Sequence, residues 1–182
     1  WVLVHGAAGG IGIAAIQIAQ LAGARVIATA STEAKRTACL EEGAEHALDY
    51  RSDFIDRVKD LTGGRGVDVV YDPIGAAVTE HSLRCLAYGG RLLILGFLGG
   101  GPASIRSNYL LIKGIEAVGV YMGGFQSNQP ATFAANTRIL LAMAAEGKIR
   151  PRISHRFPLE QAAEATQAVI NRDVIGKAVL VG

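Results

Sequence analysis

The stretch VLVHGAAGGIG at positions 2–12 decides the fold, because an apolar run meets a cluster of glycines just before the helix-forming segment IAAIQIAQLAG at 13–23. Gly9 and Gly10 lack the Cβ that would hold a phosphate away from the backbone, and Gly12 lets the following helix lie close to the strand. The first turn of that helix offers unpaired N–H groups and the positive end of the helix dipole. The stretch therefore predicts a strand, a phosphate-binding turn and a helix, the order typical of dinucleotide binding.

Composition narrows the class of protein. The chain has 182 residues, of which 50% are hydrophobic, so one sizeable core is expected. The net charge is only +2 and the basic residues are scattered, which argues against nucleic acid as a partner. No apolar run is long enough to cross a membrane without a charge or glycine. Cys39 and Cys85 have no metal-ligand spacing and fit a reducing, cytoplasmic compartment as buried thiols.

Helical and strand-like patterns alternate along the chain, and several strands are almost continuously apolar, as strands covered on both faces must be. This pattern predicts an α/β fold, a Rossmann-type doubly wound parallel sheet. We expect strands at 2–5, 25–30, 45–49, 67–72, 91–96 and 115–121, and helices at 10–22, 32–42, 53–61, 76–87, 107–113 and 130–146. Ser31 is expected to cap the helix that begins at Thr32.

The pattern changes after Gly147. Residues 1–147 are predicted to form the dinucleotide-binding domain, and residues 148–182 a strand-helix-strand segment. This segment is surplus to a nucleotide-binding fold in that interpretation, and we expect it to pack on another domain.

The end of the second predicted strand bears on the choice of cofactor. Folds that prefer NAD place an acidic side chain there to accept the ribose hydroxyls, whereas this chain has Ala30 and Ser31. No carboxylate is present there to repel a 2′-phosphate, and cations with an aromatic ring are close in sequence. NADPH is therefore favoured over NADH, with Ser31, Lys35, Arg36, Tyr50 and Arg51 as the candidate group. The alternative is that Lys35 and Arg36 are solvated charges on a helix surface.

Several motifs occur in one order: VHGAAGGIG (4–12), ATASTEAKR (28–36), ALDYR (47–51), GGRGVDVVYDPIG (63–75), GGRLLILGF (89–97) and GKAVLVG (176–182). With them the chain resembles zinc-independent medium-chain dehydrogenases/reductases of the NADPH:quinone oxidoreductase type. The resemblance implies an enzyme that passes hydride from NADPH to a quinone or an α,β-unsaturated carbonyl. It also implies a homodimer that pairs the strand at 115–121 with its symmetry mate. An N-terminal GroES-like catalytic domain would be missing, since Trp1 already begins the first strand, and such a fragment would be inactive alone.

The resemblance also assigns cofactor-binding residues. Gly9, Gly10, Ile11 and Gly12 fall at the pyrophosphate; Ser31, Lys35 and Tyr50 at the 2′-phosphate; Gly75 near the middle of the cofactor; and Gly96, Phe97, Val120 and Tyr121 around the nicotinamide end. The last four also fit a purely structural role, at a strand end or in the core. No obligatory acid or base stands out, so the catalytic residues are unknown.

Three alternatives stay open. Tyr109 and Lys113 form a YxxxK pair like that of short-chain dehydrogenases, but the pair lies too close to the glycine turn for that family. The chain could also be the enoyl-reductase part of a larger synthase, or a non-catalytic nucleotide sensor. Metal chemistry has little support, because the four histidines, of which His5 is expected to be held in the sheet, are far apart and have no cysteine at ligand spacing.

Overall fold

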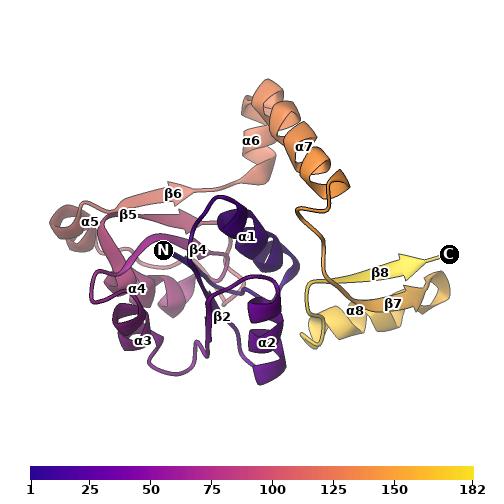
Figure 1. Ribbon diagram of the computed structural model, residues 1–182, viewed down its shortest axis with the longest axis horizontal. Helices are drawn as coiled ribbons and strands as arrows, with labels where there is room; N and C mark the ends of the chain where they lie inside the picture. Colours follow the sequence, from indigo (N-terminus) through magenta and orange to yellow (C-terminus); the bar gives the residue numbers. More distant parts are fainter.

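The computed structural model describes all 182 residues and is built around a six-stranded parallel sheet (Figure 1). The strand order is β3-β2-β1-β4-β5-β6. Strands β1 to β3 are therefore added toward one edge of the sheet and strands β4 to β6 toward the other, so the strand order reverses between β1 and β4. These strands are β1 (Val2–Val4), β2 (Val26–Thr29), β3 (His46–Leu48), β4 (Val67–Asp72), β5 (Leu86–Ile94) and β6 (Glu116–Gly119). The helices between them are α1 (Gly10–Leu21), α2 (Glu33–Glu41), α3 (Phe54–Leu61), α4 (Ala76–Cys85) and α5 (Ser107–Lys113). The predicted doubly wound sheet is confirmed.

Each face of the sheet has its own core, because neighbouring residues of a strand point to opposite faces. Leu3 and Ile27 belong to a cluster with residues of α3 and α4, whereas Val4 and Ala28 belong to a second cluster with residues of α1 and α2. The carboxyl ends of β1, β2 and β4 therefore lie between two packed layers, which fixes the positions of the loops that follow them.

Strand ends differ from the sequence prediction around β5 and β6. β5 begins at Leu86, within the predicted helix 76–87, and its pairing with β4 shifts register between Val67 and Val69. The shift accommodates Gly89 and Gly90. Because these glycines have no side chains, the alternating pattern that predicts a strand is absent there. The last paired residues are Ile94 in β5 and Gly119 in β6, a little earlier than predicted.

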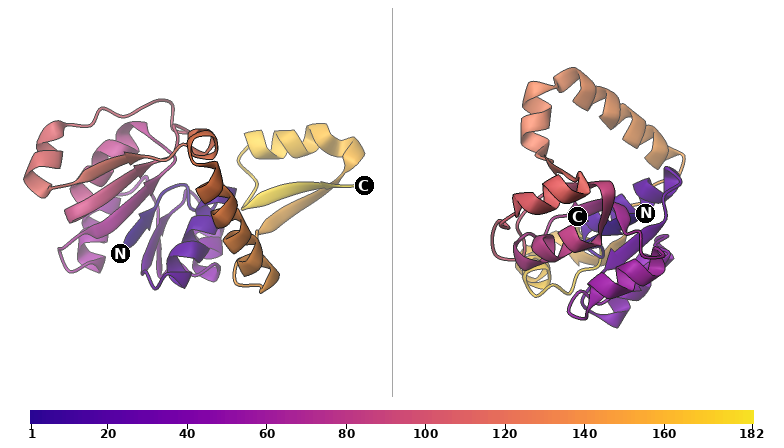
Figure 2. Two further views of the ribbon diagram at one scale, coloured as in Figure 1. Left: turned by 90° about the horizontal axis from the view of Figure 1, so that it is seen from above. Right: turned by 90° about the vertical axis from the view of Figure 1, so that its left-hand side faces the viewer.

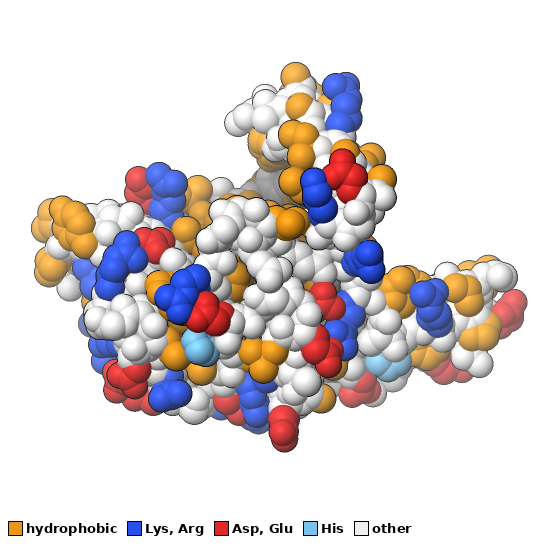
Figure 3. Space-filling model, in the orientation of Figure 1, with side chains coloured by type: hydrophobic (Ala, Val, Ile, Leu, Met, Phe, Trp, Pro, Cys, Tyr) orange, Lys and Arg blue, Asp and Glu red, His pale blue; other side chains and the backbone are white.

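The chain beyond β6 leaves the sheet as two helices, α6 (Met122–Asn128) and α7 (Pro130–Ala145), which stand away from the body (Figures 1 and 2). α6 was not predicted, because its two adjacent glycines have low helix propensity. Phe125 packs edge-on against Phe133, with ring centroids 6.1 Å apart, and holds α6 against α7. No residue of either helix is buried, and their apolar side chains are visible at the surface (Figure 3). None of the helices in the molecule combines the length and apolar character needed to span a membrane.

The remaining residues form a small parallel pair of strands, β7 (Ile153–Pro158) and β8 (Lys177–Val181), with a single 3-10 turn at Leu159–Gln161 and the helix α8 (Ala162–Ile170). This unit lies beside the sheet (Figure 2). It is fastened by the N–H of Gly176, which donates to the carbonyl of Ala8 at 2.7 Å. Arg152 adds contacts with Glu41 at 2.8 Å and Glu42 at 3.1 Å.

Candidate functional site

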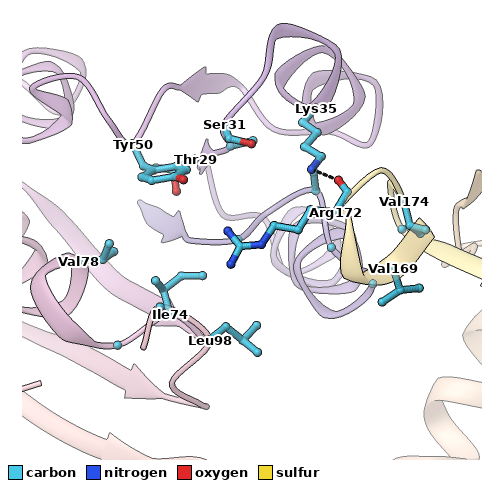
Figure 4. A pocket seen from close by; sticks show the side chains of 18 of the residues that line it. Thr29, Ser31, Lys35, Tyr50, Ile74, Val78, Leu98, Val169, Arg172 and Val174 are labelled. Carbon is cyan, nitrogen blue, oxygen red and sulfur yellow. Dashed lines mark hydrogen bonds between the residues drawn. The ribbon is translucent and has the colours of Figure 1, made fainter. Parts of the chain in front are cut away.

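A cavity of about 860 Å³ lies where the carboxyl ends of β1, β2 and β4 meet the C-terminal unit (Figure 4). Its size is that of a typical small-molecule or cofactor site. It also lies at the reversal of strand order, where doubly wound sheets bind their ligands. Six of its 22 lining residues come from the C-terminal unit: Val169, Arg172, Val174, Gly176, Lys177 and Ala178. The prediction that this segment is surplus to the nucleotide-binding fold was therefore wrong, since the last strand closes the pocket.

The glycine turn forms one wall of the pocket. A Cβ on Gly12 would lie 2.5 Å from the carbonyl oxygen of Gly6, so only glycine lets α1 start this close to the turn. Gly9 and Gly10 line the cavity, and the first N–H groups of α1 have no partner within the helix. A Cβ on Gly10 would lie 2.8 Å from Nζ of Lys177, which places this ammonium directly over the turn. The wall thus combines bare backbone, a helix N-terminus and a cation.

A second cationic group marks the end of the pocket near β2. Lys35 Nζ donates to the carbonyl of Arg172 at 2.5 Å, and the Arg172 side chain extends into the cavity (Figure 4). Ser31 and the ring of Tyr50 line the same end. The expected cap role of Ser31 was wrong: Thr32 is the N-cap of α2, and its hydroxyl accepts from the N–H of Lys35 at 3.3 Å. Ser31 therefore stays available to the pocket.

The other two predicted cations do not reach the cavity. Arg51 bonds to both carboxylate oxygens of Asp49 and donates to the carbonyl of Ser31, and Arg36 lies 3.4 Å from Asp49. Hydrogen bonds from Arg51 hold the pKa of the Asp49 carboxyl well below its usual range. Both arginines thus neutralise a carboxylate at the end of β3, and Arg51 also supports the backbone at Ser31.

The opposite end of the pocket is apolar. Ile74, Val78 and Leu98 line it, and the turn after β4 passes close to the glycine-rich loop after β5. A Cβ on Gly75 would lie 2.5 Å from the carbonyl oxygen of Gly101, and φ is +81° at Gly75, so this position requires glycine.

Buried polar groups lie directly under this pocket. His5 is fully buried; its Nδ1 is 2.9 Å from Oγ1 of Thr29 and its Nε2 is 2.7 Å from Oγ of Ser82. Because the Ser82 hydroxyl donates to the carbonyl of Val78, it accepts from His5, and the proton of the neutral ring is on Nε2. Burial lowers the pKa of His5 to about 4. The expectation that His5 is held in the sheet is confirmed.

The predicted residues divide into two groups. Six line the pocket: Gly9, Gly10, Ser31, Lys35, Tyr50 and Gly75. Gly12 acts through packing, and Ile11, Gly96, Phe97, Val120 and Tyr121 are outside the lining set. Phe97 approaches the pocket wall, since its Cδ1 would lie 3.0 Å from a Cβ on Gly75. Val120 and Tyr121 are exposed and follow the end of β6.

Two pocket cations were missed from the sequence, Arg172 and Lys177. They follow the glycine turn by about 160 residues, and no local pattern connects them to it. The available signal was the motif GKAVLVG, whose glycine, Gly176, bridges to Gly9.

The alternative catalytic pair does not face the pocket. Lys113 donates to the carbonyls of Leu83, Arg84 and Leu86, which occupies all three protons of its ammonium group. Tyr109 packs against the core cluster of α3 and α4. Lys113 thus caps the end of α4, and neither residue lines the pocket. No group of three or more His, Cys, Asp or Glu side chains is arranged to hold a metal ion.

Comparison with known proteins supports a common ancestry. Residues 10–139 match the family described as "Zinc-binding dehydrogenase", although the zinc in that description finds no ligand set in this chain. The chain is 39% identical over 181 residues to rat quinone oxidoreductase-like protein 2, covering 98% of this chain and 52% of the relative. For pig quinone oxidoreductase the identity is 35%, with 98% and 54% covered.

Among solved structures, Escherichia coli quinone oxidoreductase complexed with NADPH superimposes with a TM-score of 0.88 at 30% identity. The match covers 100% of this chain and 56% of that one. The chain thus spans about half the length of the proteins it matches.

Proposed function

Because the chain belongs to the medium-chain dehydrogenases/reductases of the quinone oxidoreductase type, we propose that its pocket binds NADPH and serves reduction of a quinone or an α,β-unsaturated carbonyl. The observation that carries this proposal is the composition of the pocket wall. Lys35, Arg172 and Lys177 line the cavity together with the glycine turn, and no carboxylate lines it. Such a cavity favours a ligand with several phosphate charges.

The polar end of the pocket would hold the adenosine half of the cofactor. The backbone of Gly9, Gly10 and Ile11 would hold the pyrophosphate, and the Lys177 ammonium next to Gly10 would contact it. Lys35, Arg172 and the Ser31 hydroxyl would hold the 2′-phosphate, and Tyr50, which lines the same end, would contact the adenosine.

The apolar end would hold the nicotinamide half. Bound NADPH supplies the hydride for reduction of the acceptor. Ile74, Val78 and Leu98 would offer the nicotinamide an apolar surface at this end of the pocket. Gly96, Phe97, Val120 and Tyr121, at the ends of β5 and β6, are proposed to flank the nicotinamide and its ribose.

Binding and turnover are separate tests. Fluorescence titration should show NADPH binding more tightly than NADH, and equal affinities would contradict the assignment of the 2′-phosphate site. Stopped-flow oxidation of bound NADPH by a panel of quinones and enones tests the reaction class. A protein that binds NADPH and reduces none of them would be a nucleotide sensor instead.

Two further expectations concern assembly. We propose that residues 1–147 form the main part of the cofactor domain, and that the segment 148–182, which completes its pocket, also contacts a catalytic domain like that of the longer relatives. β6 is the edge strand of the sheet and all four of its residues are exposed. An unpaired apolar edge favours pairing with a second copy, so we propose a homodimer that continues the sheet. Sedimentation as a monomer at high concentration would contradict it.

A further inference from the structure

One buried carboxylate lies at the junction of the two loops that form the apolar end of the pocket. Asp72, the last residue of β4, is 1% exposed. Its Oδ1 accepts from the N–H of Ile74 at 2.7 Å and from the N–H of Gly75 at 3.2 Å. Its Oδ2 accepts from the hydroxyl of Thr79 in α4. No cation forms an ion pair with this carboxylate, and its partners are two backbone N–H groups and a hydroxyl.

The turn that Asp72 holds has an unusual backbone. Gly75 has a φ of +81° and Ala76 a φ of +47°, so two consecutive residues lie in the left-handed region. An alanine in this region costs about 1–3 kcal/mol and persists only where surrounding contacts fix it. Asp72 supplies such contacts, because it accepts hydrogen bonds from the N–H groups of Ile74 and Gly75, the two residues before Ala76.

The same turn holds the next loop of the pocket. Two N–H groups of the loop after β5 donate to carbonyls of the turn: that of Gly99 to Ile74 at 2.7 Å and that of Leu98 to Pro73 at 3.1 Å. In the other direction, the N–H of Ala76 donates to the carbonyl of Gly101 at 3.0 Å. Ile74, Gly75, Leu98 and Gly99 all line the cavity. Displacement of the turn would therefore displace both loops of the apolar end, while Ser31, Lys35 and Arg172 are held by other contacts.

The distribution of buried polar residues also indicates that the backbone around this pocket is held in a specific geometry. Six polar or charged residues are buried in the molecule, and five of them line this pocket or hydrogen-bond to residues that line it: His5, Thr29, Asp72, Thr79 and Ser82. The sixth, Thr62, bonds to Val58 and Gly66 between α3 and β4, away from the pocket lining. Polar groups are costly to bury and are retained at positions that fix a specific geometry.

We propose that Asp72 is a positioning residue, which sets the turn 73–76 and through it the wall for the nicotinamide half of the cofactor. The inference rests on the proposed NADPH site and deepens it. It predicts that the two halves of the cofactor respond differently to loss of this carboxylate.

The test compares NADPH with 2′,5′-ADP, which carries only the adenosine half and the 2′-phosphate. Asp72→Ala should raise the Kd of NADPH about tenfold or more, while the Kd of 2′,5′-ADP changes by less than about twofold. Asp72→Asn keeps an acceptor for Ile74 and Gly75 and should restore most of the NADPH affinity. Equal weakening of both ligands, or no weakening in a folded variant, would overturn the proposal.

Thr62→Val is the matched control, because it also removes a buried side-chain oxygen that accepts from a backbone N–H. It should lower thermal stability and leave the ratio of the two Kd values unchanged. If Asp72→Ala does not fold, Thr79→Val gives the same comparison with a smaller change in the ratio.

Hydrogen exchange without any ligand separates this inference from the proposed function. The amides of Ile74, Gly75, Leu98 and Gly99 should lose protection in Asp72→Ala and keep it in Thr62→Val. Unchanged protection would overturn the positioning role even if NADPH binds. A wild-type protein that binds neither nucleotide would instead refute the proposed function, and the exchange result would still decide whether Asp72 sets the turn.

Discussion

The sheet and the chain that follows it differ sharply in how they are stabilised. Up to Ile115 the molecule has a buried core on both faces of the sheet, whereas after Ile115 only Ala165 and Gly176 are buried. The first region is stabilised by burial of apolar side chains. The second is attached by a few polar contacts: the N–H of Gly176 donates to Ala8, Arg152 pairs with Glu41 and Glu42, Gln17 bonds to the backbone of Arg150, and Lys35 donates to the carbonyl of Arg172. The pocket lies where the two regions meet, so its glycine turn belongs to the packed sheet and its last wall to the region that is held by few contacts.

The largest expected effect is in the core of the sheet. Leu92→Ala removes a fully buried side chain from β5 and should lower the free energy of unfolding by about 2–5 kcal/mol. Leu141→Ala changes a residue of α7 that is 65% exposed, and should change it by less than about 0.5 kcal/mol. Denaturant unfolding measures both. A similar loss in the two variants would show that α7 is buried in solution, and would end the contrast between the regions.

Lowering the pH should reduce the stability of the folded protein, because His5 is buried in its neutral form. The folded-state pKa is about 4 against an ordinary value of 6.5, so the unfolded chain takes up the proton first as the pH falls. Stability that is fully present above pH 6.5 should therefore decrease between pH 6.5 and 4, by up to about 3 kcal/mol.

Denaturant unfolding at pH 7 and at pH 4.5 measures this loss. His5→Gln should show a smaller loss, and His81→Gln, a change at an exposed position of α4, should keep the wild-type loss. If His5→Gln keeps it as well, the acid sensitivity comes from other groups.

The cations proposed to bind the 2′-phosphate and the cation over the glycine turn should differ in how their loss affects NADPH and NADH binding. Lys35→Ala and Arg172→Ala each remove a group proposed to contact the 2′-phosphate, and should weaken NADPH by about 1.5–3 kcal/mol, roughly tenfold to a hundredfold, while sparing NADH. Lys177→Ala removes a cation over the glycine turn and should weaken both cofactors. Titration of the three variants with both nucleotides measures this. Equal losses of NADPH and NADH in Lys35→Ala would refute the 2′-phosphate site.

The smallest effect is expected at the attachment of the C-terminal unit. Arg152 pairs with Glu41 and Glu42 at the surface, and such pairs contribute about 0.2–1 kcal/mol. Arg152→Gln should therefore lower thermal stability only slightly, but should weaken NADPH binding if the unit loosens. Arg91→Gln, which breaks the exposed pair with Glu116, is the control. A large stability loss in Arg152→Gln alone would mean that the two regions unfold as one.

The contrast also explains how far sequence reasoning reached. Apolar strands, glycine turns and helix caps are local signals, and they predicted the sheet and the wall formed by Gly9, Gly10 and Gly12. The pocket residues from 169 to 178 depend on the contact of Gly176 with Ala8, which is far away in sequence. No periodicity encodes such a contact.

Other differences have local physical causes. Thr32 caps α2 in place of its neighbour Ser31, because cap positions are set by the exact backbone angles at the first turn. Arg36 and Arg51 are neighbours of the pocket in sequence, but Asp49 binds both. A basic residue near a strand end therefore predicts a phosphate site only when no carboxylate lies close enough to pair with it.

The bridge between Gly9 and Gly176 has a consequence for the order of assembly during synthesis. Gly9 precedes Gly176 by 167 residues in the sequence, so the glycine turn leaves the ribosome well before its partner strand. All six strands of the sheet can pair before Gly176 is available, because proteins are made and fold from the amino end onward. A nascent chain therefore has its phosphate turn in place long before it has a closed pocket, and nucleotide capture must await synthesis of Gly176 and β8.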